Sequence, residues 1–379
     1  MIIPFTTILT FASLYLPQPI LPLFAAEFGV ADTDAALLTA VTMIPLGVAP
    51  IAYGFLVDRL SAKRLLRAAV GGLVVTELLL AVSGSFWMLL LLRFLQGLVL
   101  PGAITALMTY SASMASAGRV RNALNIYIGT SIIGGVSGRL LGGFVSEYLH
   151  WRVAFLILAA LLAVAWLGMG RLRDDARSHV SRLGAEAIRR TLSTPLYRNA
   201  FLGIFFVFFV FASLLNYLPF RLKALNPQIM ESTISLAYLG YLIGVLIALN
   251  GVKIADRLGG ELRGIAVGLL LLAVGVIGVS SNSTAAVFGF VFCLCAGFFL
   301  IHSLMSAYLN HLTSGQRGVV NGLYISSYYA GGALGGWLPG YVFRGAGWDA
   351  YLAALMAMLL VAAWWIRGMH AASREPAID

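Results

Sequence analysis

Long apolar blocks limit the folds open to this chain more than any other feature of its sequence. A helix needs about 20 mostly apolar residues to cross a bilayer, and about twelve such blocks follow one another here. They begin near Ile2, Ala36, Leu66, Phe86, Arg121, Arg152, Asn199, Thr233, Arg263, Thr284, Arg317 and Trp348. A membrane β-barrel would instead show short segments of alternating polarity. The pattern predicts an all-α polytopic membrane protein with about twelve transmembrane helices.

The positive charge of the chain is distributed by topology. The net charge is +10, which in a soluble protein would make nucleic acid a candidate partner. Here the basic residues concentrate on alternate loops, and the opposite face keeps only Arg152, Arg221, Lys223 and Arg344. Lysine and arginine mark the cytoplasmic side of a membrane protein. We therefore expect a multi-pass membrane protein with both termini in the cytoplasm and no nucleic-acid partner.

Tryptophans fall at the ends of several apolar blocks. Trp87, Trp151 and Trp348 lie at predicted outer ends, and Trp364 and Trp365 lie at a predicted inner end. Tryptophan is enriched at both membrane–water interfaces, so the sequence predicts that these side chains form an aromatic belt.

An internal repeat appears when the chain is shifted by 197 residues. The stretch NIYIGTSIIGGVSGRLLGG at 125–143 then aligns with GLYISSYYAGGALGGWLPG at 322–340. Tyr127, Gly134, Gly135 and Gly138 meet identical residues, as does Trp151 further along. Repeated halves facing one another across a central pathway are typical of secondary transporters. We predict an N-terminal six-helix half at 1–170, a cytoplasmic linker at 171–198 and a C-terminal six-helix half at 199–379.

Four stretches resemble motifs of the major facilitator superfamily. GFLVDRLSAKR at 54–64 is similar to the signature between helices 2 and 3, although Ser61 stands where that family usually has glycine. GVKIADRLGG at 251–260 resembles a degraded copy in the second half, and RFLQG at 93–97 resembles the helix-4 motif. The glycine-rich stretch in helix 5 resembles the motif of the drug:proton antiporter branch, without its proline. Over nearly its whole length the chain resembles the arabinose-efflux-permease-like antiporters of that branch. The resemblance implies the twelve-helix major facilitator fold, a transport function and a location in the bacterial inner membrane.

The glycines of helix 5 permit close packing. Gly134, Gly138 and Gly142 are four residues apart and share one helix face, where small residues let a neighbouring backbone approach. We predict tight packing against a helix of the same half. A pivot that helps to gate the pathway, with Gly135 alongside, is the functional alternative.

Arg139 places a charge inside this apolar helix. An intramembrane charge costs several kcal/mol unless it reaches water or a partner. Two arrangements are open: the side chain extends outward, or it pairs with an acid, for which Glu147 lies two turns away. Structural pairing and a gating role are equally compatible with the sequence.

Charged residues near the predicted inner surface form a second candidate gate. By resemblance, Gly54, Asp58, Arg59 and Arg64 tie helices together in one transport state, with Asp256 and Arg257 as counterparts in the second half. Basic residues are expected there from topology alone. Asp58 is not, because acidic residues contribute little to orientation, so gating is the favoured role for Asp58 and Arg59.

Few side chains could carry a proton inside the membrane. Glu77 is the only acid deep in a predicted helix, and intramembrane acids commonly serve proton relays. Arg93 matches the helix-4 motif and could repel a proton from a nearby acid or bind an anion. His302 on helix 10 titrates near neutrality, although a lone histidine is often structural. We predict proton coupling through Arg93, Glu77 or His302.

By resemblance, helices 1, 4, 7 and 10 line the pathway. The polar and aromatic residues on them are Tyr15, Gln18, Arg93, Gln96, Asn216, Tyr217, His302 and Ser306, and we predict that these bind substrate. Such a lining suits amphipathic or cationic molecules through stacking and cation–π contact. The missing carboxylates and the basic residues could instead favour neutral or anionic molecules, so the charge of the cargo stays open.

The favoured function is proton-coupled export of small amphipathic molecules or drugs by alternating access. The alternative is a carrier for one metabolite, sugar or siderophore-type solute. No phosphate-binding loop, nucleophile elbow or HExxH spacing occurs, so we expect no enzyme activity, cofactor, metal or ATP coupling. The two cysteines, Cys293 and Cys295, fit no metal pattern. The expected partners are the substrate, protons and lipid, and the expected state is a monomer.

Overall fold

The chain forms a bundle of long helices. The computed structural model describes residues 2–57, 61–114, 119–173, 184–313 and 317–373, and within these ranges it contains helices and no β-strand. In the first half α1 (Ile2–Tyr15) continues through a 3-10 turn, η1 (Gln18–Ile20), into α2 (Leu21–Phe28). The other helices of that half are α3 (Asp32–Val57), α4 (Ala62–Ala81), α5 (Phe86–Ser113), α6 (Val120–Tyr148) and α7 (Trp151–Gly168), which ends in the turn η2 (Met169–Arg171).

The second half repeats this plan after a short connecting helix, α8 (Ala185–Ser193). Its first helix is α9 (Pro195–Leu225), and its second joins α10 (Glu231–Leu236), a 3-10 turn η3 (Ala237–Tyr241) and α11 (Leu242–Leu258). The remaining helices are α12 (Glu261–Gly278), α13 (Thr284–Leu312), α14 (Arg317–Gly335) and α15 (Gly340–Ala372). Within the described ranges nine segments meet the length and apolarity of a membrane span. Counting the broken helices as single segments, the predicted twelve-helix fold is confirmed.

The last apolar block begins earlier than the sequence suggested. α15 starts at Gly340 rather than near Trp348, and Gly347 interrupts it with a φ of +83°. Only glycine adopts this backbone conformation at little cost. The apolar block recognised in the sequence is the segment after this kink.

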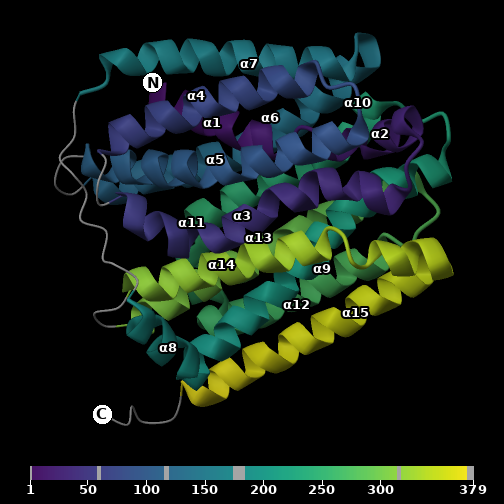
Figure 1. Ribbon diagram of the computed structural model, residues 1–379. Helices are drawn as coiled ribbons and strands as arrows, with labels where there is room; N and C mark the ends of the chain where they lie inside the picture. The colour runs from purple at the N-terminus through teal and green to yellow at the C-terminus, as the bar shows by residue number, and fades with distance from the viewer. Residues whose placement is uncertain (1, 58–60, 115–118, 174–183, 314–316, 374–379) are drawn as a thin grey trace.

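Both chain ends lie at the same end of the bundle (Figure 1). We call this the termini end, and we call the opposite end, where α2 meets α3 and α9 meets α10, the distal end. Within the halves, α1 packs on α6 and α9 packs on α14 and α15. Between the halves, α3 packs on α14, and α6 packs on α10 and α11. Each half therefore packs its first membrane segment against its fifth, and each fifth segment also packs against the second segment of the other half.

A stripe of glycines lets α6 touch α1, as predicted. A Cβ atom at Gly134, Gly138 or Gly142 would overlap the carbonyl oxygens of Ile8, Ala12 and Leu16 respectively. The repeat reproduces this contact in the second half. There, a Cβ at Gly331 or Gly335 would overlap the carbonyl oxygens of Phe205 and Phe209. In both pairs the glycine and the carbonyl that it faces lie 197 residues after their counterparts in the first half. The two halves therefore repeat the same atomic contacts.

A second glycine stripe, one residue along, faces the other half. Gly143 lies against Ser235 and the carbonyl oxygen of Glu231 in α10. Gly332 lies against Phe208 of its own half and, slightly further away, against Met43 of α3. Adjacent stripes of small residues therefore give α6 and α14 two close contacts each, one inside their own half and one across the interface.

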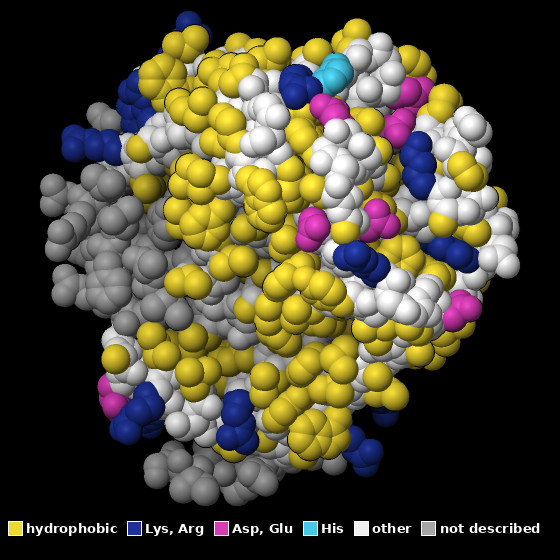
Figure 2. All heavy atoms as spheres, turned by 45° about the vertical axis from the view of Figure 1, so that its right-hand side comes forward, with side chains coloured by type: hydrophobic (Ala, Val, Ile, Leu, Met, Phe, Trp, Pro, Cys, Tyr) yellow, Lys and Arg dark blue, Asp and Glu magenta, His cyan; other side chains and the backbone are white. Residues whose placement is uncertain are grey.

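Two of the tryptophans expected at the lipid boundary are buried. Trp151 and Trp348 are 1% and 7% exposed, and their indole N–H groups donate to Glu27 and to the Val279 carbonyl. The belt prediction is wrong for both, because each indole finds a hydrogen-bond partner inside the bundle. Trp87 and Trp364 are exposed, at 71% and 64%. Apolar side chains dominate the surface in Figure 2, a view that turns the distal end toward the reader.

Replacing Gly138 by alanine should lower the melting temperature of the purified protein in detergent, because the new methyl group meets the Ala12 backbone. Overpacking of this kind costs about 1–3 kcal/mol. The matched control is Gly289→Ala in α13, where nothing lies within 4 Å of the added Cβ and alanine is the better helix former. Equal melting temperatures for the two variants would contradict the packing assignment.

Candidate functional site

A break in the first membrane segment is the starting point of the site. α1 ends at Tyr15 and η1 begins at Gln18. Pro17 has no N–H, so the carbonyl of Ser13 has no donor four residues ahead. Arg93 of α5 fills this place: its Nη1 donates to the Ser13 oxygen at 2.8 Å and its Nη2 donates to the Leu14 oxygen at 2.7 Å. The arginine thus replaces backbone hydrogen bonds that the proline removes.

Arg93 also connects the break to a buried carboxyl group. Its Nε donates to the Leu38 carbonyl of α3 at 2.8 Å, and its Nη1 also donates to the side-chain oxygen of Gln96. The Gln96 amide in turn donates to Oε1 of Glu77 in α4 at 2.7 Å. Arg93 is 1% exposed, and Gln96 and Glu77 are fully buried. We call Glu77, Gln96 and Arg93 the first-half relay.

One oxygen of the Glu77 carboxyl group has no hydrogen-bond partner among the described residues. Oε2 is buried and accepts no hydrogen bond from the described part of the chain. The Ser13 hydroxyl, which also lies near the carboxyl, donates instead to the Leu9 carbonyl at 3.1 Å. Arg93 is close enough to act electrostatically on Glu77. Within the described part of the chain, Oε2 is therefore the oxygen of this carboxyl group to which a proton could be added.

Arg139 lies on the other side of the same break and is also fully buried. Its Nε donates to Oε1 of Gln18 at 2.7 Å, Nη1 donates to the Gly135 carbonyl at 2.9 Å, and Nη2 donates to the Tyr241 hydroxyl at 3.0 Å. It neither extends to the surface nor pairs with Glu147. The carboxylate of Glu147 instead accepts from the backbone N–H of Ser232 at 3.0 Å, at the start of α10.

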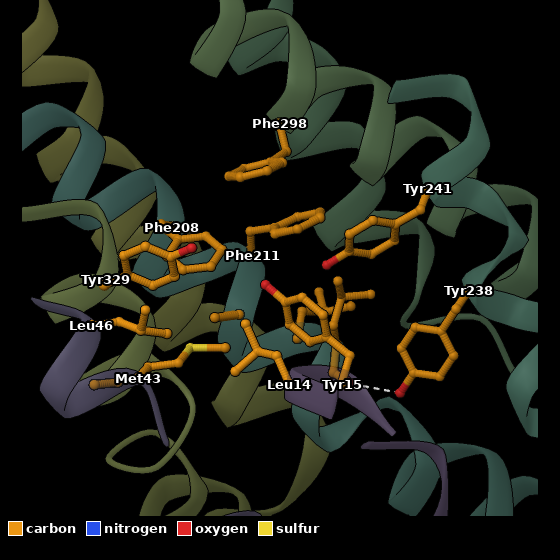
Figure 3. Close-up of a cluster of buried hydrophobic side chains, with 14 of the residues drawn as sticks. Leu14, Tyr15, Met43, Leu46, Phe208, Phe211, Tyr238, Tyr241, Phe298 and Tyr329 are labelled. Atoms are coloured by element: carbon orange, nitrogen blue, oxygen red, sulfur yellow. Dashed lines mark hydrogen bonds between the residues drawn. The ribbon is translucent and has the colours of Figure 1, made fainter. Parts of the chain in front are cut away.

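Three tyrosine rings surround the Arg139 guanidinium. Its central carbon lies 4.1 Å from the ring centre of Tyr15, 4.8 Å from that of Tyr238 and 4.2 Å from that of Tyr241. Figure 3 shows Tyr15, contributed by the first half, facing Tyr238 and Tyr241 of the second half. We call these three residues the tyrosine cage. Cation–π contacts of this kind stabilise a desolvated cation by about 2 kcal/mol or more.

Asn216 of α9 joins helices from both halves. Its Oδ1 accepts from Nε2 of Gln18 at 3.2 Å and from the Thr39 hydroxyl. Its Nδ2 donates to the carbonyls of Ala36 at 2.9 Å and Gly336 at 2.8 Å. Both oxygen lone pairs and both amide hydrogens are used, so this side chain is saturated. It fixes α3, the α1 break and the end of α14 to α9.

An aromatic cluster continues the interface toward the termini end. Phe211 stacks on Phe298 with ring centres 3.7 Å apart, and Phe208 stacks on Tyr328 at 3.8 Å. His302 lies next to them, and its Nδ1 is 3.0 Å from the Tyr324 hydroxyl. Figure 3 shows Phe208 and Phe211 between Phe298 on one side and Leu14 and Met43 of the first half on the other. The rings of Phe208, Phe211 and Phe298 are buried in this cluster.

The predicted site residues therefore divide into groups. Tyr15, Gln18 and Asn216 meet Arg139 at the interface between the halves, whereas Arg93, Gln96 and Glu77 lie inside the first half. His302 belongs to the aromatic cluster. The structure does not bring Tyr217 or Ser306 to these groups. The Tyr217 hydroxyl donates to the Trp337 carbonyl at 3.1 Å, and its ring packs on Phe343 and Tyr351. The Ser306 carbonyl accepts from Asn310 at 2.8 Å.

Several residues at the interface were not foreseen. Tyr238, Tyr241 and Thr39 take part in the hydrogen bonds or ring contacts described above. No sequence signal marked them, because tyrosine and threonine are unremarkable in membrane helices. The 3-10 turn at Ala237–Tyr241 could be found only in three dimensions.

The predicted gate at the termini end is only partly visible. Asp58 and Arg59 lie outside the described residues, and Gly54 lies in α3. The backbone N–H of Arg64 donates to the Ser61 hydroxyl, which caps α4. Asp256 and Arg257 lie in the last turn of α11, which ends at Gly259 with a φ of +83°. Their gating roles stay predictions. The described residues contain no group that could hold a metal ion.

Comparisons with known proteins agree on one family. A family model for the Major Facilitator Superfamily matches residues 4–300. The uncharacterized MFS-type transporter YybF of Bacillus subtilis (strain 168) is 27% identical over 361 residues, which is 94% of this chain and 89% of that protein. The inner membrane transport protein YnfM of Escherichia coli (strain K12) is 26% identical over 364 residues, covering 93% and 86%.

Two further matches are limited, one by the share of the chain that it covers and the other by its low sequence identity. The multidrug resistance protein MdtG of Salmonella arizonae is 30% identical over 171 residues, which is 42% of this chain and 40% of that protein. The crystal structure of a bacterial homolog to the human lysosomal transporter Spinster, inward-facing and unoccupied, has a TM-score of 0.81 at 15% identity and covers 99% of this chain and 98% of its own. At this identity the structural likeness concerns the fold alone.

Replacing Asn216 by leucine should loosen the contact between the halves, because it leaves two backbone carbonyls and Gln18 without their partner. Each unsatisfied buried group costs about 1–3 kcal/mol. The reporter is Ser235→Cys, which is buried opposite Gly143, in a background with Cys293 and Cys295 replaced by alanine. We expect a water-soluble maleimide to label it about tenfold faster or more.

The matched control for this experiment is Tyr217→Phe, on the next residue of the same helix. It removes one hydrogen bond that stays within the second half. Equal labelling rates in the Asn216→Leu and Tyr217→Phe backgrounds would show that Asn216 does not hold the halves together.

Proposed function

Because the chain belongs to the Major Facilitator Superfamily, a family of membrane transporters, we propose that it exports small amphipathic molecules in exchange for protons. The carrier would work by alternating access, in which the two halves rock about a central site. The partial similarity to MdtG supports export. The bias of basic residues toward one face supports placing the termini end in the cytoplasm, and the name of the Escherichia coli relative supports the inner membrane.

One observation carries the proposal: an unbroken chain of contacts joins a buried carboxyl group to the interface between the halves. It runs from Glu77 through Gln96 to Arg93 and from Arg93 to the carbonyls of Ser13 and Leu14. The next residue, Tyr15, is part of the tyrosine cage. A proton on Glu77 would weaken its attraction to Arg93, and Arg93 holds the α1 break in place.

This geometry gives the proton a way to bias the two conformations. In the structure described here the α1 break supplies Tyr15 and Gln18 to Arg139 and Asn216 at the interface. A change at Arg93 would move these groups relative to the second half. A ligand or proton shifts such an equilibrium only through different interactions in the two states. The relay contains a charge whose partner changes with protonation, which meets this requirement.

The remaining roles follow from position. The glycine stripes of α6 and α14 would act as the surfaces on which the halves turn, and the aromatic cluster near His302 would bind the apolar part of the cargo. Asp58, Arg59, Asp256 and Arg257 would close the termini end in the opposite state. The transporter would act as a monomer and would need no cofactor.

The Glu77→Gln variant should lose coupling and keep binding, because glutamine can still accept from Gln96 but cannot exchange a proton. Proteoliposomes with an imposed pH gradient would be tested with cationic, neutral and anionic amphipathic compounds while the lumenal pH is recorded. We expect the substrate-evoked proton flux to fall to the level of empty liposomes. Exchange of labelled for unlabelled substrate, which moves no net proton, should continue.

The control variant is Glu186→Gln in α8, whose carboxylate is 76% exposed and should leave the flux unchanged. Loss of flux in both variants, or in neither, would contradict coupling through Glu77. Saturable transport of one solute without proton flux would identify a specific facilitative carrier instead of an exporter.

A further inference from the structure

No carboxylate of the described residues contacts the Arg139 guanidinium at the interface between the halves. The structure describes ten of the acidic residues, and among them only Glu77 lies away from the helix ends and the linker. Glu77 lies inside the first half and interacts with Arg93 and Gln96. The other nine lie in terminal turns, in α8 or, in the case of Asp349, directly after the Gly347 kink of α15: Glu27, Asp32, Asp34, Glu147, Glu186, Glu231, Asp256, Glu261 and Asp349. Within the described residues, Arg139 therefore has only neutral partners.

The two buried arginines differ in how much of their binding capacity is used. Arg93 makes four hydrogen bonds, three of them to backbone carbonyls of its own half. Arg139 makes three bonds from five N–H groups. One N–H on each terminal nitrogen makes no hydrogen bond to the described residues. Each of these two groups is a charged donor of the kind that a carboxylate oxygen accepts from.

The partners of Arg139 also belong to two bodies that must separate. Gln18, Gly135 and Tyr15 are in the first half, while Tyr238 and Tyr241 are in the second. When the halves part, the cation keeps the first set and loses two rings and one oxygen acceptor. A buried charge that loses its partners costs several kcal/mol. Some other group has to compensate the guanidinium at that stage.

We propose that this group is the cargo, and that the cargo is an organic anion: a monocarboxylate on an aromatic body. The inference rests on the transport function proposed above and specifies its substrate class. The carboxylate binds the two free N–H groups of Arg139, and the aromatic body stacks on Tyr15 in place of the departing Tyr238 and Tyr241 rings. The cargo carries a single negative charge because Arg139 is the one buried arginine that loses partners; Arg93 keeps its partners within the first half.

The test compares three compounds on one skeleton: an aryl carboxylate, its primary amide and the corresponding amine. Binding is measured by thermal stabilisation of the purified protein in detergent, without a pH gradient. A charge-assisted bond to arginine is worth about 1.5–3 kcal/mol, so the carboxylate should bind about 10–100-fold more tightly than the amide. A carboxylate no better than its amide, including the case in which neither binds, would overturn the proposal, as would tightest binding of the amine.

Two variants make the assignment specific. Arg139→Gln should remove the preference for the carboxylate over the amide. Tyr241→Phe keeps the ring but removes the oxygen that accepts from Nη2, so it should strengthen carboxylate binding, and it keeps the test valid if Arg139→Gln does not fold. The control is Arg152→Gln, at a partly exposed ion pair with Glu27, which should change nothing. Unchanged carboxylate binding in both Arg139→Gln and Tyr241→Phe would refute the site.

The failure of this inference can be told apart from that of proton export. Binding in detergent does not depend on coupling, so a carboxylate preference lost in Arg139→Gln would stand even if Glu77→Gln had no effect on proton flux. Conversely, substrate-evoked proton flux with cationic compounds alone would support export and refute the anionic cargo.

Discussion

The rest of the structure depends on one constraint: backbone carbonyls cannot be left without hydrogen bonds in an apolar interior. Pro17 interrupts the first membrane helix and leaves the Ser13 carbonyl without its usual donor. Arg93 reaches across from α5 to satisfy this oxygen and that of Leu14. A charged side chain is thereby stabilised inside the bundle, and the break becomes a junction. Glu77 and Gln96 attach on one side of it, and Arg139 and Asn216 attach on the other.

Two arginines of similar burial have different consequences because their neighbours differ. Arg93 interacts with an acid and with fixed carbonyls of one half, so it stiffens the half that contains it. Arg139 lies among tyrosine rings and neutral oxygens contributed by both halves. Its stabilisation therefore depends on the halves staying together. Burial alone would not distinguish the two side chains. They differ because the partners of Arg93 all lie in one half, whereas those of Arg139 lie in both.

The two glycine stripes would reconcile close backbone contact with the relative movement of the halves that the proposed transport cycle requires. Gly134, Gly138 and Gly142 press α6 against carbonyls of α1 and build the half. Gly143, one position along, presses the same helix against α10 of the other half. Small residues make few interlocking contacts, so a surface of this kind can be tightly packed without side chains that must be withdrawn when it slides. The first of these two stripes recurs 197 residues later in α14, where Gly331 and Gly335 lie against carbonyls of α9.

The sequence by itself determined the helical membrane fold, the twofold repeat and the packing of the α6 glycines, because apolar length and four-residue spacing are local properties of the chain. It also singled out Glu77, Arg93 and Arg139, since charge in an apolar block is conspicuous. Only the tertiary structure decided their partners. Arg139 faces Tyr238 and Tyr241, about 100 residues away in sequence, and Trp151 faces inward rather than toward lipid. Such pairings depend on how helices rotate and cross, and hydrophobic spacing in a single chain does not record the rotation of a helix whose faces are all apolar.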